Sequence, residues 1–304
     1  MALDSVGVKN IPHPNCLTLR PFSLRYNDDP SLWITPFVEP INGLKAAFKI
    51  IGFSDKLKSQ TLSSVSVQIH ELLMILEHWL NDGMVILGPI NRTKIWNRID
   101  SRYYKGAAYY IYVLSYDNNY YLVHDPEGCP CLLLSKSTLI EALDIKYFEI
   151  GIIQLPNSLT TNSNRDIYQR TLFAGINSCI AGSHHSKGGS NGLYILSKII
   201  ASKKLKSSEE GVLHFLIPSL SLSAHYVSEF LLDLPKSVIN NICCYDEIIS
   251  AILLTLTEEI NLCAYTLDCL IRRDIKSLPN QFTKLAINRK KTEELFTSIT
   301  FQNE

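Results

Sequence analysis

The 304-residue sequence has no excess charge of either sign, because 29 Lys and Arg residues balance 29 Asp and Glu residues. A neutral chain without a strong basic cluster has no electrostatic basis for binding nucleic acid. No apolar run reaches membrane-spanning length, since the most apolar stretch, 251–254, is bounded by Glu247 and by Glu258 and Glu259. The first residues also lack a basic region followed by an apolar one. We therefore expect no signal peptide, no membrane span and a cytoplasmic location.

The sequence also lacks the residue spacing of a metal site. In an intracellular protein, the eight cysteines are expected to be buried thiols. Cys129 and Cys131 are too close together for a zinc knuckle, and no second pair follows at ligand spacing. The pair His184-His185 has no cysteine or acidic residue nearby. We therefore expect neither a metal nor a cofactor.

What the sequence does contain is enough apolar residues, 46%, for one large domain or two modest ones. Its most informative stretch is 83–134. An apolar run there stops at Gly88-Pro89, a tyrosine-rich run covers 108–116, and Asn118-Asn119 turns the chain into a returning run at 120–123. This pattern predicts a strand, a loop and a β-hairpin.

The flanking segments complete an α+β half. Apolar residues recur at helical spacing over 66–81, and Asn81-Asp82-Gly83 ends that helix. Residues 31–56 are rich in Pro, Phe and Gly and predict loops with short strands, one of them at 49–53. A short helix is expected at 137–142 and a further strand at 147–155.

The clearest domain boundary is the polar, turn-prone segment 160–164. Beyond it, helical spacing predicts an α-helical bundle. The predicted helices cover 165–181, 192–203, 224–234, 239–271 and 290–298. We therefore expect two domains, 1–159 and 165–304. The glycine-rich loop 182–192 is either a flexible connection or an anion cradle to which Lys187 contributes charge.

Three short motifs in the first half resemble a known family. They are VILGP at 85–89, the strand that opens at Gly106 and continues to Val113, and VHDPEG at 123–128. Together they resemble the papain-like cysteine fold, in the branch of the bacteriocin-leader peptidases and the butirosin-type acyltransferases of antibiotic biosynthesis. This resemblance covers roughly the first half of the chain and implies a helix packed on an antiparallel sheet.

The resemblance also implies a catalytic site. The family uses a cysteine nucleophile, a histidine on the central strand and an orienting Asp or Asn after the next strand. The corresponding residues here are Cys16, Tyr109 and Asp125, so a tyrosine stands at the histidine position. Because tyrosine has an ordinary pKa near ~10, it is a poor base at neutral pH. Pro21 is expected to shorten or bend the helix that carries Cys16.

Three explanations of this replacement remain open. Another histidine, His124 or His13, could supply the base, although strand alternation points His124 and Asp125 to opposite faces. The pocket could bind a ligand without cutting it. Tyr109 could also act as an acid or an oxyanion donor. Cys16 itself is equally consistent with a small buried residue at the start of a core segment.

The expected substrate contacts are Asn15, Trp96, Tyr110 and His124. The aromatic residues around Trp96 and Tyr110 predict an apolar-walled cleft, and strand propensity with core packing explains them nearly as well.

The resemblance implies acyl transfer or amide formation in natural-product (peptide or antibiotic) biosynthesis, with Cys16 acting on a carrier-bound or thioester substrate. Peptide cleavage is less consistent with the missing histidine. The alternative is a catalytically inactive papain-like scaffold that binds a small molecule, a peptide or a protein partner. Expected partners of the enzyme are an acyl or peptidyl carrier protein, a small-molecule substrate and a second copy of the chain in a homodimer.

Overall fold

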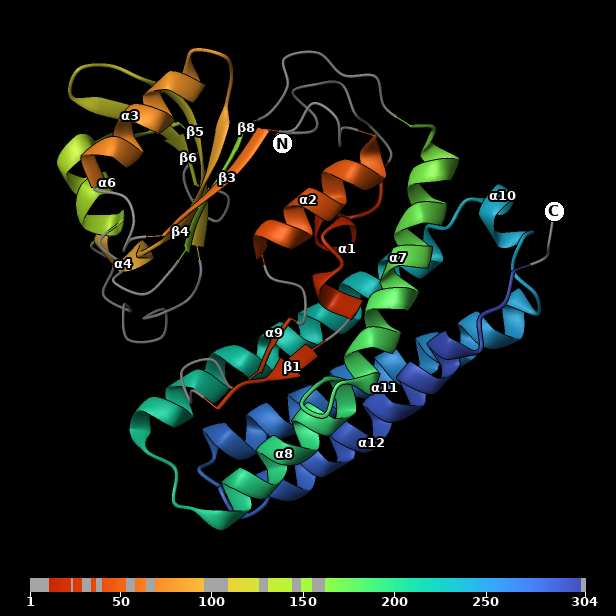
Figure 1. The fold of residues 1–304 in the computed structure, drawn as a ribbon. Helices are drawn as coiled ribbons and strands as arrows, with labels where there is room; N and C mark the ends of the chain where they lie inside the picture. The colour runs from red at the N-terminus through yellow and green to blue at the C-terminus, as the bar shows by residue number, and fades with distance from the viewer. Residues whose placement is uncertain are drawn as a thin grey trace. The chain divides into compact units, whose positions relative to one another are not determined.

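A computed structural model describes ten stretches of the chain: residues 11–22, 24–28, 34–36, 40–52, 58–63, 69–95, 109–125, 131–143, 149–154 and 162–301. The chain divides into two compact units, which we call the sheet unit (1–7 and 53–160) and the helical unit (8–52 and 161–304). Figure 1 shows both. The α+β class, with a largely helical second half, is confirmed. The change of unit after Thr160 adjoins the predicted boundary, whereas residues 8–52 belong to the helical unit rather than to a 1–159 domain.

The sheet unit contains a six-stranded antiparallel sheet with the strand order β3-β8-β4-β5-β6-β7. Its strands are β3 (Lys58–Ser63), β4 (Val85–Ile90), β5 (Tyr109–Tyr116), β6 (Tyr120–His124), β7 (Leu132–Ser135) and β8 (Glu149–Gln154). The predicted hairpin is confirmed as β5 and β6, which pair from Tyr116 with Tyr121 to Tyr112 with His124. A turn closes it, in which the Asp117 carboxylate accepts the backbone N–H groups of Asn119 and Tyr120, each at 2.7 Å.

Helices pack on this sheet and form its core. They are α3 (Ile69–Leu80), α4 (Arg92–Ile95) and α6 (Lys136–Leu143). α3 lies against β4, β5 and β8, and α6 lies against β4 and β7. The helical spacing of α3 buries Leu72, Leu73 and Leu76 against the strands, as the sequence predicted. In the same core, the fully buried Tyr121 donates a hydrogen bond from its hydroxyl to Glu77 Oε1 at 2.8 Å. Lys136 Nζ donates to the same oxygen at 2.6 Å.

The helical unit is built on long helices that coincide with the predicted ones in part: the helices predicted at 165–181, 224–234 and 290–298 begin earlier than expected, whereas the one predicted at 239–271 is interrupted by a turn at 240–244. They are α7 (Asn164–His184), α8 (Gly189–Ser202), α9 (Ser207–Leu232), α10 (Lys236–Ile239), α11 (Tyr245–Ile271) and α12 (Leu278–Thr297). Within the unit, α12 packs between α8 and α11, and α11 packs on α9 (Figure 1). α9 begins well before the predicted 224 because Pro218, normally a helix breaker, is accommodated inside it.

An N-terminal arm, residues 11–52, packs into the helical unit. It comprises α1 (Pro14–Leu17), the 3₁₀ turn η2 (Arg20–Phe22), β1 (Leu24–Tyr26), β2 (Ile34–Pro36) and α2 (Pro40–Ile51). The strand predicted at 49–53 is wrong for its described part, since Lys49, Ile50 and Ile51 end α2. The two β-branched isoleucines favour a strand, but Pro40 at the first helical position and a buried face through Ala47, Phe48 and Ile51 favour the helix.

Aromatic packing anchors the arm. The Phe22 ring meets the rings of Phe230 and Phe296 edge-on, with centroids 6.0 and 6.1 Å apart. A side chain on Gly175 of α7 would collide with the Phe22 ring, so the glycine makes room for it. Near the end of the arm, the Asn162 N–H donates to Ile51 O and its Nδ2 donates to Ile50 O, both at 2.9 Å. The two chain segments of the helical unit, 8–52 and 161–304, therefore contact each other at Ile50, Ile51 and Asn162, on either side of segment 53–160 in the sequence.

Two helices have the length and apolar composition of a membrane span, namely α9 from Glu209 onward and α11. Core helices of soluble proteins pass the same test, so the signal is weak. The exposed positions of α11 include Asp246, Glu247 and Glu258. Both apolar and charged side chains are therefore exposed on α11, since Leu254, Tyr265 and Ile271 are also among its exposed residues.

Candidate functional site

Cys16 lies in α1 of the helical unit and is completely buried. Its thiol donates a hydrogen bond to the backbone carbonyl of Tyr226 in α9, with Sγ and O 3.3 Å apart. As predicted from Pro21, the helix is short: it covers four residues, and a 3₁₀ turn follows it. The short helix contributes little dipole stabilisation to a thiolate.

The surroundings of Cys16 favour the neutral thiol. Burial, together with the negative charge of Glu229, raises the pKa of Cys16 to about 12. A reactive cysteine needs an electropositive, partly exposed setting that lowers its pKa. Cys16 has the opposite setting and resembles a structural core residue.

His13 is the sequence-predicted histidine that the structure places beside Cys16. It lies one turn earlier, and its backbone carbonyl accepts the Cys16 N–H at 2.8 Å. Its ring stacks on the Tyr226 ring, with centroids 4.1 Å apart and planes within 14°. Nearby on α9, His225 Nε2 and Glu229 Oε1 are 3.3 Å apart. Burial lowers the pKa of His13; the Glu229 charge opposes that shift and His225 adds to it.

The other predicted site residues belong to the sheet unit. Asp125 follows β6 and is buried, and Tyr110 is half-buried on β5. His124 points away from the core face, and its ring centroid is 5.9 Å from that of Tyr112. Cys16 belongs to the helical unit and Asp125 to the sheet unit, so neither unit by itself contains both residues.

Some predicted residues lie wholly or partly outside the described structure. Trp96 is outside the described residues, as are the side chains of Asn15 and Tyr109. The backbone of Asn15 belongs to α1, and that of Tyr109 opens β5. Their expected roles remain predictions.

The free edge of the sheet was not predicted from the sequence. β7 is the last strand of the sheet, and among the described residues only β6 pairs with it. Leu133 of β7 is 65% exposed, and Tyr120 of β6 is 44% exposed. The run of three leucines at 132–134 could have indicated this edge, because neighbouring side chains of a strand point to opposite faces. Leu134 is therefore buried and Leu133 is exposed.

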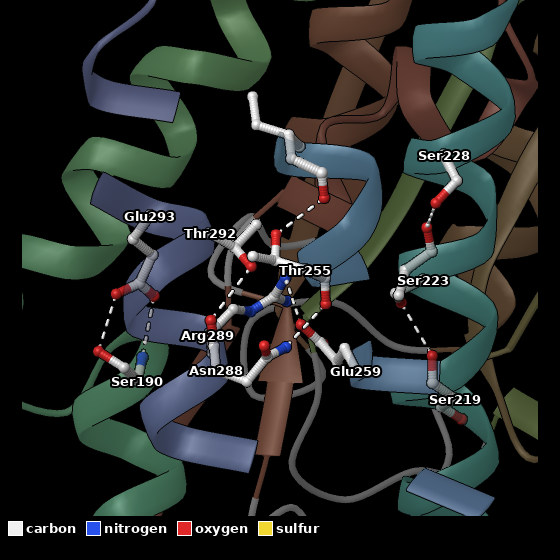
Figure 2. A network of polar contacts seen from close by, with 12 residues as sticks. Ser190, Ser219, Ser223, Ser228, Thr255, Glu259, Asn288, Arg289, Thr292 and Glu293 are labelled. Carbon is white, nitrogen blue, oxygen red and sulfur yellow. Dashed lines mark hydrogen bonds and ion pairs between the residues drawn. The ribbon is translucent and has the colours of Figure 1, made fainter. Parts of the chain in front are cut away.

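A buried polar network in the helical unit was also not predicted (Figure 2). Glu293 of α12 reaches α8, where its Oε1 accepts the Ser190 N–H at 2.9 Å and its Oε2 accepts the Ser190 hydroxyl at 2.8 Å. One turn earlier on α12, Arg289 Nη1 lies 3.4 Å from Glu259 Oε2 of α11. Asn288 Nδ2 donates to the Thr255 carbonyl at 2.8 Å. These contacts join three helices through groups that are almost fully buried.

The 182–192 segment therefore does not provide the anion cradle considered above. Glu293 already occupies the N-terminus of α8, and a Cβ on Gly189 would overlap its carboxylate. Lys187, the expected source of charge, pairs with Asp28 at 2.6 Å. Across the described ranges, no three His, Cys, Asp or Glu side chains gather so as to hold a metal ion.

Comparison with known proteins adds no relative. No protein-family model matches the chain, and no curated protein matches it.

Proposed function

We propose that this protein is a binding scaffold rather than a cysteine enzyme. The observation that carries the proposal is the state of Cys16, which is fully buried and bonded through its thiol to the Tyr226 carbonyl. Its pKa, raised to about 12 by burial, keeps it neutral at physiological pH. Tyr109 stands at the position that corresponds to the catalytic histidine of the papain-like family that the sequence resembles, which agrees with a scaffold that lacks a catalytic base.

The β7 edge is the surface that best suits a partner. Soluble proteins protect free strand edges with polar and charged residues, and the opposite edge strand β3 has such a sequence, KSQTLS. β7 reads LLLS and exposes Leu133. An extended peptide added to such an edge gains main-chain hydrogen bonds, and alternate apolar side chains give specificity. The proposed partner is therefore an extended, partly apolar peptide segment.

The test of Cys16 uses intact and peptide mass spectrometry. The folded protein is incubated with iodoacetamide at about pH 8, and separately with a panel of acyl thioesters. We expect the exposed Cys131 to be alkylated readily and Cys16 to stay unmodified by both reagents. A thioester-derived mass gain that disappears in Cys16→Ala would overturn the scaffold proposal.

The test of binding uses a displayed random peptide library. Peptides selected on the parent protein are titrated against Leu133→Lys and against Met74→Lys, which alters another exposed apolar residue of the same unit. We expect Leu133→Lys to weaken binding about tenfold or more and Met74→Lys to leave it unchanged. Equal affinity for both variants would exclude the β7 edge.

Acyl transfer is the second candidate, and one observation favours it. The His13 ring and the Cys16 thiol both contact Tyr226, and the negative charge of Glu229 acts on both groups, so His13 and Glu229 are the candidates for proton carrier and orienting acid after a rearrangement that frees the thiol. In this candidate the thioester panel labels Cys16, so the same experiment separates the two functions.

A further inference from the structure

The helical unit has two connections at one end of its bundle. Residues 203–206 join α8 to α9, and residues 272–277 join α11 to α12. Leu205 of the first connection belongs to the same apolar cluster as Leu270 and Leu278, which flank the second. At the same end, the Ser197 hydroxyl of α8 donates to Pro279 O of α12 at 2.8 Å. Folding therefore brings together two segments that are far apart in the sequence, at the end of the bundle opposite α10 (Figure 1).

Both connections are rich in cations. Together they contain six Lys and Arg residues and one carboxylate, Asp274, which accepts the Ser277 hydroxyl at 2.5 Å. All six cations are exposed. We call these six residues the basic tip: Lys203, Lys204, Lys206, Arg272, Arg273 and Lys276.

Most charges of the basic tip are available to an external anion. Two of the six cations are paired within the unit, Lys203 with Glu209 at 2.5 Å and Arg272 with Asp268 at 2.8 Å. None of the remaining four forms an ion pair with a carboxylate of the described ranges. The tip is therefore a positive surface that the unit itself does not neutralise.

The opposite end of the bundle has the other sign of charge. Segment 233–247, which contains α10 and the start of α11, holds three carboxylates and one lysine: Asp233, Asp246, Glu247 and Lys236. Because α11 has 27 residues, it separates the two ends by about 40 Å. The helical unit is thus polarised along its length although the whole chain is neutral, and composition alone did not reveal the basic tip.

An exposed isoleucine lies next to these charges. Ile271 is the last residue of α11, is 64% exposed and directly precedes Arg272 and Arg273. An apolar side chain beside cations suits an anionic bilayer, where the cations meet headgroup charges and the apolar group enters the boundary between headgroups and acyl chains. Nucleic acid fits less well, because single strands are held largely by aromatic stacking, and segments 203–206 and 271–277 contain no aromatic residue.

We propose that the basic tip docks the helical unit onto an anionic lipid surface, with Ile271 buried among the headgroups. Each Lys or Arg near such a surface strengthens binding by about fivefold, so a cluster of cations binds where a single one does not. The binding is peripheral and reversible, and it weakens as salt screens the charges. The tip is independent of the β7 edge, which belongs to the other unit.

The experiment measures sedimentation of the full-length chain with lipid vesicles. Vesicles of phosphatidylcholine alone are compared with vesicles that contain about 30% phosphatidylserine, at about 0.1 M salt. We expect binding to the phosphatidylserine vesicles to be at least about tenfold tighter. That difference should disappear at about 0.5 M salt.

Arg273→Glu with Lys276→Glu reverses two exposed cations that have no ion pair among the described residues. We expect this double variant to bind phosphatidylserine vesicles at least about tenfold more weakly than the parent. Lys236→Glu with Lys291→Glu is the matched control, since it changes the net charge equally at exposed lysines outside the tip. The control should bind within about twofold of the parent. Lys204→Glu, in the other connection, is the independent variant if the double variant does not fold, and it should weaken binding several-fold.

Ile271→Asn keeps every cation of the basic tip and removes the apolar group. We expect it to weaken vesicle binding several-fold, because the side chain no longer gains from leaving water. The proposal is overturned by equal binding to both kinds of vesicle, by equal weakening in the tip and control variants, or by an Ile271→Asn variant that binds like the parent. Tighter binding of a single-stranded RNA than of phosphatidylserine vesicles, through the same cations, also overturns it. Each of these outcomes leaves the peptide-binding proposal, which depends on Leu133, unaffected.

Discussion

The buried guanidinium of Arg289 pairs with Glu259 and also lies in the field of a second carboxylate, Glu293. Glu259 and Arg289 are 1% and 3% exposed and face each other across α11 and α12. Burial raises the pKa of Glu259; Arg289 opposes that shift and Glu293 adds to it. Removing the cation therefore leaves an isolated buried carboxylate, which proteins tolerate poorly.

We expect Arg289→Met to lower the free energy of unfolding by about 3–5 kcal/mol near neutral pH. Because the raised pKa lets Glu259 take up a proton, the loss should be largest at about pH 8 and shrink towards about pH 5. Urea unfolding at both pH values measures it. The double variant Glu259→Gln with Arg289→Met should recover most of the loss. An equal loss at both pH values, or no recovery, would show that the charge is not what matters.

At the scale of elements, α8 depends on a cap supplied by another helix. Its N-cap residue is Gly188, which has no side chain to offer, and Glu293 of α12 provides the acceptor from 103 residues away. A carboxylate at a helix N-terminus satisfies an unpaired N–H group and interacts favourably with the helix dipole. The start of α8 is thereby fixed next to β1, where the Tyr26 N–H donates to Lys187 O at 2.7 Å.

We expect Glu293→Gln to destabilise the protein by about 1–2 kcal/mol, because the charged acceptor of two buried hydrogen bonds is replaced by a neutral amide. Glu294→Gln is the matched control, since Glu294 is an exposed neighbour whose Lys290 contact is 3.9 Å long. Its effect should stay within about 0.5 kcal/mol. Chemical denaturation of the three proteins side by side measures both effects, and equal stability of the two variants would argue against the cap.

Elements with a strong local pattern could be predicted from the sequence, and elements defined by distant partners could not. The hairpin around Asn118-Asn119 and the helix at 69–80 follow from spacing and turn residues. The segment 49–51 has the composition of a strand, and only its packing in the arm makes it helical. Nothing local to Ser190 indicates that Glu293 will cap its helix, because the two residues meet only in the folded bundle.

For the molecule as a whole, the 53–160 segment of the sheet unit is an insertion in the chain of the helical unit. The two ends of the helical unit's chain that flank this insertion lie in contact, since Asn162 donates hydrogen bonds to the carbonyls of Ile50 and Ile51. The family resemblance and the boundary predicted at 160–164 assigned Cys16 to the same domain as Asp125, whereas the two residues belong to different units. Apolar residues of the arm pack instead against the helices of the bundle, as the Phe22 ring does against the rings of Phe230 and Phe296.

We expect the helical unit to fold without residues 53–160 when Gly52 is joined to Asn162 through a short glycine-serine link. The reason is that both ends already touch and the unit has its own apolar cores. Circular dichroism should show high helix content and a single cooperative thermal transition. As a control, the same deletion with Phe22→Ala should be markedly less stable, by about 3–5 kcal/mol. A deletion protein that is helical but melts without cooperativity would contradict the prediction.

The edge-on contact of the Phe22 ring with the Phe296 ring also sets an order of folding events during synthesis on the ribosome. The arm is synthesised before the helix that completes its packing, with the whole sheet unit segment 53–160 between them. At about 5–20 residues per second, roughly 15–55 s separate the two partners. The sheet unit, which needs no residue beyond 160, can complete its own core in that interval. We therefore expect nascent chains stalled before α12 to contain a finished sheet and an arm that is still accessible to chaperones.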